Sequence, residues 1–370
     1  MKKFNLQNSK NDKLLFFQKF LMQEMKRIHD NLSTKNKKDF LAIIEQQERE
    51  RTSFISSYRR IPLGCESFFV VLRKWNSYTP SLPITEKSIK KVSQYSVGGG
   101  YFLFVQEEEN PLKPGYGLVI DPGYNFIHNF GSTGFCLDDI DGILITHAHN
   151  DHTNDFESLL SLLHQRNNKF IGKRMPRKVD LFLNVGSFKK FSNYLDLANK
   201  NKKNYIGDVI VMSPGQIYTI PSRKDMDFHL FTLFTEHHEI VTADYALGIC
   251  FKFGDRIVLL TGDTGWKKET VDKNNDFLTS KGCFTGDEKV NILVSHIGSI
   301  IRKEFEINDT GENFESHYYD QHLGILGVIS YIENLKPEFC IISEFGEELA
   351  GLRGKVVSEL NKTCKKFSKK

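Results

Sequence analysis

The sequence lacks any apolar run of the roughly 20 residues that a helix needs to cross a bilayer, so we expect no membrane span. Its first eight residues hold two lysines and no continuous apolar run, unlike a secretory signal, and we therefore expect a cytoplasmic protein. The six cysteines include no Cys-x-x-Cys pair. Scattered cysteines of this kind fit buried free thiols better than disulfides or a zinc ribbon.

A strong excess of one charge is also missing, because the net charge is only +4. The distribution is uneven, however. Residues 1–60 hold 14 Lys/Arg against 7 Asp/Glu, and residues 362–370 hold five lysines and no acid, which leaves −8 on the rest. Basic ends on an acidic body could contact nucleic acid or another anionic partner, or they could simply be solvated.

The chain divides by pattern into a helical N-terminal extension, residues 1–60, and a main domain, residues 61–370. Apolar side chains recur at helical spacing over about 13–30 and about 37–50, which predicts a helical hairpin. The hairpin could pack on the core, form a homodimer contact or bind substrate. Residues 78–83 contain two prolines and read as an extended linker.

The main domain is rich in short apolar runs bounded by turn residues, and several of these runs follow one another without a helix between them. This order favours two stacked sheets flanked by helices over a doubly wound parallel sheet. We expect strands at 98–105, 117–120, 142–146, 181–184, 209–212, 228–235, 247–253, 256–261, 290–295 and 339–343, and helices at 155–165, 188–198, 324–335 and after 347.

Three histidines and one aspartate fall within six residues directly after the apolar run 142–146: His147, His149, Asp151 and His152. His147 and His149 are two apart, so in extended backbone their side chains point to the same side. Asp151 and His152 follow as the chain bends towards the next helix. Imidazole nitrogens and a carboxylate are ligands for divalent metals. A polar loop with accidental histidines is a weak alternative, and we predict a metal site at the end of a buried strand.

This run matches the His-x-His-x-Asp-His signature of the metallo-β-lactamase superfamily. The sequence resembles that superfamily over roughly residues 95–350, and most closely its ribonuclease Z and phosphodiesterase-like branch. The resemblance implies an α/β (α+β) fold, a four-layer αββα sandwich, with the N-terminal helices as an extension. It also implies one or two metal ions at the ends of the central strands, with zinc expected and manganese the alternative.

Three further residues stand where the superfamily has metal-site motifs. Asp121 ends an apolar strand before Pro-Gly and could orient the metal loop through backbone amides instead of ligating. His238 is the expected third-motif ligand, with its neighbour His237 as the alternative. Asp263, in Gly-Asp-Thr after the run 256–261, matches the fourth motif, in which one carboxylate bridges two metals.

The chain departs from the family pattern at the fifth motif. The superfamily has a histidine after the last sheet strand, and here Glu344 follows the run 339–343. A carboxylate can still bind zinc, and it suits manganese or magnesium better than imidazole does. We predict Glu344 as the ligand, and His296, at the end of the run 290–295, as the alternative source of the missing nitrogen.

His322 directly precedes the helix expected at 324–335. In the ribonuclease Z-like branch, a histidine at such a helix start is not a metal ligand and acts near the scissile phosphate. The resemblance therefore implies a catalytic role for His322, and the helix N-terminus beside it would favour an anion. The alternative is an ordinary histidine at a helix start.

Together these residues predict a metal-dependent hydrolase, first of all a phosphodiesterase or nuclease in which a metal-bound hydroxide attacks phosphorus. Asp151 would relay a proton and His322 would protonate the leaving group. One alternative is a small-molecule hydrolase acting on a lactone, thioester or cyclic nucleotide. Another is a non-catalytic scaffold in which Glu344 marks decay of the site. The acidic body counts against the nuclease, and the intact histidine cluster counts against the scaffold.

Overall fold

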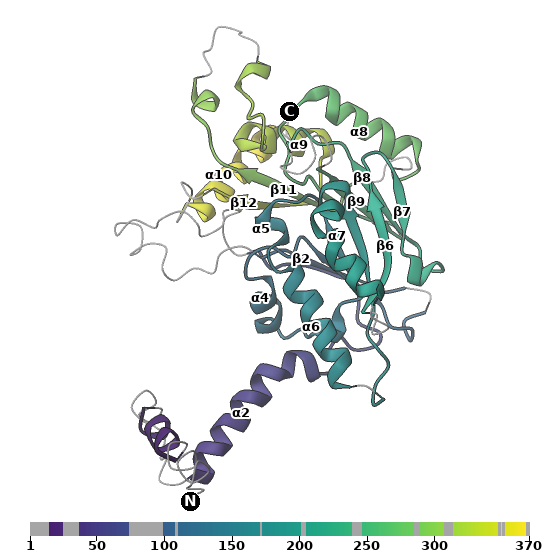
Figure 1. Ribbon diagram of the computed structural model, residues 1–370. Helices are drawn as coiled ribbons and strands as arrows, with labels where there is room; N and C mark the ends of the chain where they lie inside the picture. The colour runs from purple at the N-terminus through teal and green to yellow at the C-terminus, as the bar shows by residue number, and fades with distance from the viewer. Residues whose placement is uncertain are drawn as a thin grey trace, which may run out of the picture. The chain divides into compact units, whose positions relative to one another are not determined.

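The computed structural model describes residues 15–24, 37–73, 99–107, 110–170, 172–200, 205–238, 246–284, 289–306, 314–346, 349 and 352–367 (Figure 1). The chain forms two compact units, Met1–Ser56 and Ser57–Lys370. In the first unit, residues 15–24 are helical and α2 spans Lys37–Ser56. The linker predicted at 78–83 lies outside the described residues. Within these ranges, no helix combines the length and the apolar character that crossing a bilayer requires.

The second unit is built on two six-stranded sheets. The first has the order β1-β2-β3-β4-β5-β6, and the second has the order β12-β11-β10-β9-β8-β7. The strands of the first sheet are β1 (Phe68–Val71), β2 (Tyr101–Val105), β3 (Tyr116–Ile120), β4 (Gly142–Ile145), β5 (Val179–Asn184) and β6 (Ile206–Met212). Those of the second are β7 (Ile217–Thr219), β8 (Phe228–Leu233), β9 (Gly248–Phe253), β10 (Arg256–Leu260), β11 (Ile292–Gly298) and β12 (Phe339–Phe345).

Helices cover the outer faces of both sheets, which completes four αββα layers (Figure 1). The helices are α4 (Phe126–Ser132), α5 (Asn150–Thr153), α6 (Phe156–Lys169), α7 (Val185–Lys200), α8 (Lys268–Ser280), α9 (Gly324–Leu335) and α10 (Arg353–Phe367). One apolar core lies between the sheets, and a second lies between the second sheet and the helices α8, α9 and α10. The predicted sandwich is therefore confirmed.

The central strands are apolar on both faces because each sheet is covered on both sides. All five residues of β2 are buried, with Tyr101 and Leu103 in the core between the sheets and Phe102 packing edge-on against Phe130 of α4. Burial on both faces explains why the sequence shows continuous apolar runs instead of alternation. It also explains why these runs were readable as strands.

Parallel pairing brings the site residues to one edge. Strands β3, β4, β5 and β6 are mutually parallel, so the segments after Ile120 and Ile145 emerge at the same edge of the first sheet. In the second sheet β10, β11 and β12 are parallel, and β8 runs the same way because β9 is antiparallel to both of its neighbours. The amide of Leu247 donates to the carbonyl of Thr146 at 3.2 Å, which joins the two sheets at that edge.

Most predicted elements match the observed ones within a few residues, and the helix expected at 324–335 has the bounds of α9. The sequence pattern does not predict the elements with little apolar content. Helix α8 has only three large apolar side chains in 13 residues, and β7 is three residues long. The pattern also does not predict strand β1 and helix α4, because both are short and lie beside glycines and turn residues.

Candidate metal centre

The predicted histidine cluster begins where β4 ends. His147 and His149 lie in the loop, with Nε2 of His147 at 3.1 Å from Nδ1 of His149. Asp151 and His152 belong to the single turn α5 (Asn150–Thr153). Because α5 turns the chain back, His152 faces the same space, with its ring centroid 4.0 Å from that of His147. The extended start and the helical end of the motif therefore converge on one site.

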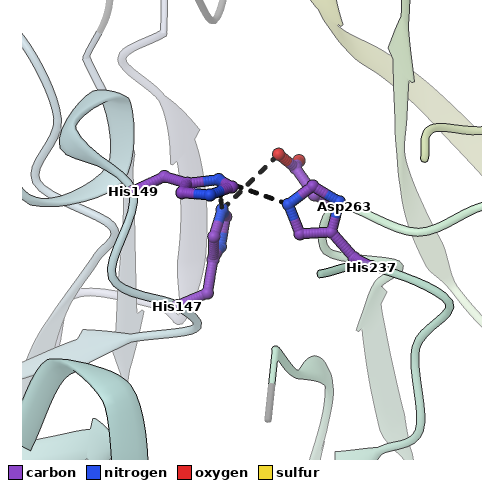
Figure 2. A group of neighbouring side chains, drawn as sticks. All are labelled: His147, His149, His237 and Asp263. Carbon is purple, nitrogen blue, oxygen red and sulfur yellow. Dashed lines mark hydrogen bonds and ion pairs between the residues drawn. The ribbon is translucent and has the colours of Figure 1, made fainter. Parts of the chain in front are cut away.

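The segment after β8 supplies His237 to this site, not His238. Nε2 of His237 lies 3.3 Å from Nδ1 of His149, and the His237 side chain is buried (Figure 2). His238 is exposed and is not part of the cluster. The preference for His238 is thus corrected in favour of the alternative. Adjacent side chains of an extended segment point to opposite sides, so only one of the pair can face inwards.

The gathered residues form two groups that share Asp263. In the first group, ligand atoms of His147, His149, His237 and Asp263 all lie within 4.8 Å of one another. In the second group, the same holds for Asp151, His152, Asp263 and Glu344. Asp263 follows β10, where a carboxylate with two oxygens stands between the groups. A carboxylate shared in this way could bind one metal ion in each group.

Glu344 reaches the second group from the end of β12, with Oε2 3.6 Å from Nε2 of His152. His296, the alternative ligand, stands behind this group. Its Nδ1 lies 3.0 Å from Oδ1 of Asp263 and 3.1 Å from Oε1 of Glu344. Its Nε2 lies 3.0 Å from the hydroxyl of Tyr101, which donates to Ser343. The structure therefore places His296 as a support of two carboxylates.

Asp121 orients the cluster without joining either group. Its carboxylate accepts from the amide of Thr146 at 2.8 Å and from the Thr146 hydroxyl at 2.7 Å. It also accepts from Nδ1 of His152 at 3.0 Å, which leaves Nε2 of that ring facing the second group. Fixing the tautomer of a ligand histidine in this way is a general feature of metal sites.

Asp121 and Glu344 adopt left-handed backbone conformations, with φ of 48° and 57°. Residues other than glycine rarely adopt positive φ, and such strain persists where the surrounding structure enforces it. Both carboxylates are buried. The fold therefore holds two unfavourable backbone conformations at the centre of the site.

The imidazoles of the first group are in the form that binds metal. Burial lowers the pKa of His149 to about 4 and holds the pKa values of His147 and His237 below their usual range. All three rings are therefore neutral at pH 7 and offer a lone pair. His237 donates from Nδ1 to the carbonyl of Gln321 at 3.0 Å, which leaves Nε2 for the centre.

The second group attracts positive charge. Burial alone would lower the pKa of His152, but the carboxylates of Glu344, Asp151 and Asp263 outweigh it and raise that pKa well above its usual value. Burial likewise opposes ionisation of Asp263, yet the neighbouring His152 and His322 keep its pKa well below the usual range. The buried carboxylate of Asp263 therefore stays ionised and favours a cation beside it.

The residues present fit a divalent metal. Nε2 of His152 and Oε2 of Glu344 are buried and accept no hydrogen bond from any residue that the structure describes. Leaving buried polar atoms unpaired costs roughly 1–3 kcal/mol each. A metal ion in the second group would take up these lone pairs. Neutral histidines with one carboxylate in the first group are a donor set that zinc accepts, whereas the oxygen-rich second group also suits manganese.

His322 lies beside the groups, at the start of α9. Its Nδ1 is 3.9 Å from Oδ2 of Asp263, and its side chain is about one-fifth exposed. Gly298, with φ of 62°, makes room for it, because a Cβ there would meet the His322 ring carbon Cγ at 2.5 Å. The structure thus places His322 between the metal groups and the surface.

One buried residue of this site escaped the sequence reasoning. Arg73, just after β1, has no exposed side-chain surface, and its Nε lies 3.2 Å from Oε1 of Glu344. A single arginine beyond a short apolar run carries no motif. Only the topology, which puts β1 next to β2, brings it to the centre.

Solved structures of similar fold support the architecture. The metallo-β-lactamase fold protein YhfI from Bacillus subtilis aligns with a TM-score of 0.50 at 13% identity, over 80% of this chain and 92% of that one. A long form RNase Z from yeast aligns with a TM-score of 0.50 at 13% identity, over 77% of this chain and 38% of that one. Together with the two stacked sheets, these alignments show the metallo-β-lactamase fold that the sequence predicted.

A more particular similarity lies within the first part of the domain. The family model of Anti-Pycsar protein Apyc1 matches residues 111–284. Anti-Pycsar protein Apyc1 of Bacillus phage vB_BsuM-Goe3 is 29% identical over 168 residues, which are 43% of this chain and 60% of that protein. The protein of the same name from Bacillus phage 010DV004 is 41% identical over 69 residues, which are 19% and 24% of the two chains.

The chain thus matches less than two thirds of these relatives. The segment that matches the family model contains the whole first group and most of the second. It ends before His322 and Glu344.

Proposed function

We propose that the protein is a metal-dependent hydrolase that cleaves phosphodiesters. The observation that carries this proposal is the pair of ligand groups sharing Asp263. Two metal ions about 3.5–4 Å apart are the common device for stabilising the attacking and leaving oxygens of a displacement at phosphorus. The similarity to the ribonuclease Z fold and to Anti-Pycsar proteins supports the proposal.

The first group would hold one zinc ion through its three neutral imidazoles, and the second group would hold a zinc or manganese ion through its oxygens. Such ions lower the pKa of a bound water towards about 7 and stabilise the negative charge that develops on the phosphoryl oxygens. The chain's own part is to fix the ligands. Asp121 and Gln321 do so by holding His152 and His237 in single orientations.

Asp151 is the proposed proton acceptor. Its Oδ2 lies 3.4 Å from Nε2 of His152, and its side chain keeps about one-fifth of its surface exposed. Burial opposes ionisation, but His152 and Arg73 lower its pKa, so it is a carboxylate at neutral pH. A partly exposed carboxylate within the second group can accept the proton of an attacking water.

His322 is the proposed proton donor to the leaving oxygen. Its Nδ1 is buried and has no hydrogen-bond partner among the residues that the structure describes, although the ring reaches the surface. The amide of Leu326 at the start of α9 already donates to the carboxylate of Glu304 at 2.9 Å, so His322 itself is the group here that would face the phosphodiester. A phosphodiester between the metal groups and this helix end would meet His322 on its outer side.

The experiment is hydrolysis of bis(p-nitrophenyl) phosphate by zinc- and manganese-loaded protein, with Asp151→Asn and His322→Ala as variants. We expect turnover by the native protein, and a loss of about 10²–10⁴-fold in kcat for His322→Ala with the metal content unchanged. His317→Ala, which removes a histidine outside both groups, should behave like the native protein. A fully metallated protein without turnover would contradict the proposal and favour lactone or thioester substrates.

The size of the substrate is a second question. Polynucleotide binding through the basic termini would weaken steeply with salt, because phosphate contacts release counterions. Turnover of a small cyclic phosphodiester would not show this dependence. A salt series with both substrates therefore separates a nuclease from a small-molecule phosphodiesterase.

A further inference from the structure

Lys190 of helix α7 bonds to the loop that carries the histidine cluster, residues 147–153, which we call the metal loop. Its ammonium group donates to the carbonyl of Ala148 at 2.8 Å, to Oδ1 of Asn150 at 2.9 Å and to the hydroxyl of Thr153 at 2.8 Å. An ammonium group has three N–H donors, so this loop offers an acceptor for each of them. Lys190 belongs to no metal motif and lies 42 positions after the first of these acceptors.

The fold places the start of α7 beside the metal loop. Strands β4 and β5 are parallel, with Ile145 opposite Leu183, so the segments that follow them emerge at the same edge of the first sheet. Helix α7 begins there, directly after β5. Its first turn is held by Asn184, whose Oδ1 accepts from the amide of Ser187 at 2.9 Å. Lys190 therefore stands in the second turn of a helix whose position relative to the metal loop is fixed.

Packing next to Lys190 holds its side chain near the loop. The neighbouring Phe191 is buried, and its ring centroid lies 4.6 Å from that of Phe156, at the start of α6. Helix α6 follows the metal loop, so this contact ties α7 to the segment that the loop enters. The ammonium of Lys190 lies 5.2 Å from the centroid of the Phe191 ring, within the range of a cation–π contact. Aromatic packing and hydrogen bonds thus favour the same direction of the lysine side chain.

The bonds of Lys190 reach the peptide groups on both sides of the ligand His149. On the first side, the ammonium holds the carbonyl of Ala148 directly. On the second side, the Thr153 hydroxyl accepts from Lys190 and donates to the carbonyl of His149 at 2.9 Å. A hydroxyl can accept and donate at once, so the two bonds are compatible. The backbone of His149, with φ of −63° and ψ of 149°, is therefore held from both sides.

His149 depends on its backbone more than the other imidazoles of the first group do. The hydroxyl of Thr146 lies 3.1 Å from Nδ1 of His147, and His237 donates to the carbonyl of Gln321. Within the described part of the chain, Nε2 of His149 has no such partner. Its Nδ1 faces the group, 3.1 Å from Nε2 of His147 and 3.3 Å from Nε2 of His237 (Figure 2). Because Nδ1 is the ring nitrogen nearer to the backbone, its position follows the backbone closely.

We propose that Lys190 is a positioning residue of the metal centre, which acts by holding the backbone of His149. This inference rests on the metal centre of the proposed function and adds a residue that lies outside every metal motif. The partners of metal ligands are part of a metal site, and their loss lowers metal affinity by about 10–100-fold. For His149 this part is played by bonds to its backbone instead of a bond to its ring.

The test is a zinc titration of the full chain in the presence of a competing chelator. Lys190→Met keeps most of the apolar stem and removes the three donors. We expect the zinc ion of the first group to bind about 10–100-fold more weakly in this variant. Lys189→Met removes the same charge from an adjacent exposed position of α7 and should bind zinc like the native protein. Native affinity in Lys190→Met, or equal weakening in Lys189→Met, would overturn the proposal.

Stability separates positioning from a purely structural role. Lys190 is an exposed residue, so we expect urea unfolding of metal-free Lys190→Met to stay close to that of the native protein. A loss of stability together with native zinc affinity in the folded protein would make Lys190 a structural residue only, and would overturn the proposal.

A second variant reaches the same bonds from the loop. Thr153→Val keeps the shape of the side chain and removes the hydroxyl between Lys190 and the His149 carbonyl, so zinc binding should again weaken. Because both residues act on the same backbone, the double variant should lose less affinity than the product of the two single effects. Fully independent effects would contradict a shared action on His149. Zinc affinity that depends on Lys190 in a protein without phosphodiester turnover would retain this role and refute the proposed function.

Discussion

Arg73 lies with its Nε 3.2 Å from Oε1 of Glu344, and neither side chain is exposed to solvent. Glu344 stands where the resemblance to the metallo-β-lactamase superfamily predicts a histidine, and its carboxylate brings a negative charge that an imidazole would not. The guanidinium of Arg73 balances that charge, and its own pKa is raised further by Glu344 despite burial. The two residues are therefore coupled through their charges.

Loss of Arg73 should destabilise the metal-free protein. In Arg73→Met, Glu344 stays buried without its partner, and breaking a buried ion pair from one side costs about 3–5 kcal/mol. Urea unfolding with a chelator present measures this change. Saturating metal should reduce the loss, because a second cation then faces Glu344. Arg302→Met, which removes an exposed ion pair to Glu306, should change little. An equal, small effect of both variants would show that Arg73 does not balance Glu344.

Asp263 should matter for both metal ions, and Glu344 for only one. Asp263→Asn removes charge from both groups, whereas Glu344→Gln changes the second group alone. We expect metal analysis after dialysis to show that Glu344→Gln retains about one ion per chain and Asp263→Asn fewer. Glu344→His should shift the second group from manganese towards zinc, since imidazole favours zinc. Equal metal contents in Asp263→Asn and Glu344→Gln would contradict a shared carboxylate.

The adjacent histidines His237 and His238 provide a variant and its control, because only His237 belongs to a metal group. His237→Ala should weaken binding of the first ion, because it removes one of three neutral imidazoles. His238→Ala changes an exposed side chain outside the cluster and should leave metal affinity unaltered. Titration with zinc in the presence of a competing chelator gives both affinities. Weakening by His238→Ala alone would restore the expectation made from the sequence.

The stability of the metal-free protein should pass through a maximum near pH 6.5. An unfolded histidine titrates near 6.5, whereas His149 has a pKa of about 4 and burial also lowers those of His147 and His237. As the pH falls from about 6.5 to 4, the unfolded chain binds protons that these folded rings do not, so the free energy of unfolding falls. His152, with a raised pKa, contributes stability below 6.5 that is lost as the pH rises through its folded value.

Unfolding in urea at pH 5, 6.5 and 8 with a chelator present measures how the free energy of unfolding changes on the acid side and on the alkaline side of this maximum. His149→Asn should reduce the fall in the free energy of unfolding between pH 6.5 and pH 5. His128→Asn, which changes an exposed side chain, should leave that fall as it is in the native protein. If the free energy of unfolding of His149→Asn fell as steeply below pH 6.5 as that of the native protein, the assignment of His149 as a neutral buried ring would be contradicted.

The sequence predicts those parts of the fold in which the order of apolar and polar residues matches the order of buried and exposed side chains. Continuous apolar runs marked β2, β3, β4 and β10, because strands covered on both faces need no polar side. The run from His147 to His152 could be read as a ligand set, since all its members lie within one strand end and one helical turn. Helix α8 could not be predicted from the apolar pattern, because its buried face is narrow and its other residues are polar.

The sequence by itself determined the chemistry of the site: which histidines and carboxylates stand at strand ends, and that a glutamate replaces the last histidine. Only the tertiary structure decided which of two neighbouring histidines faces inwards, that Asp263 joins two groups, and that Arg73 balances Glu344. These choices depend on residues up to 271 positions apart, from Arg73 to Glu344. Parallel pairing within each sheet and stacking of the two sheets bring such residues to one edge, and no local pattern records those contacts.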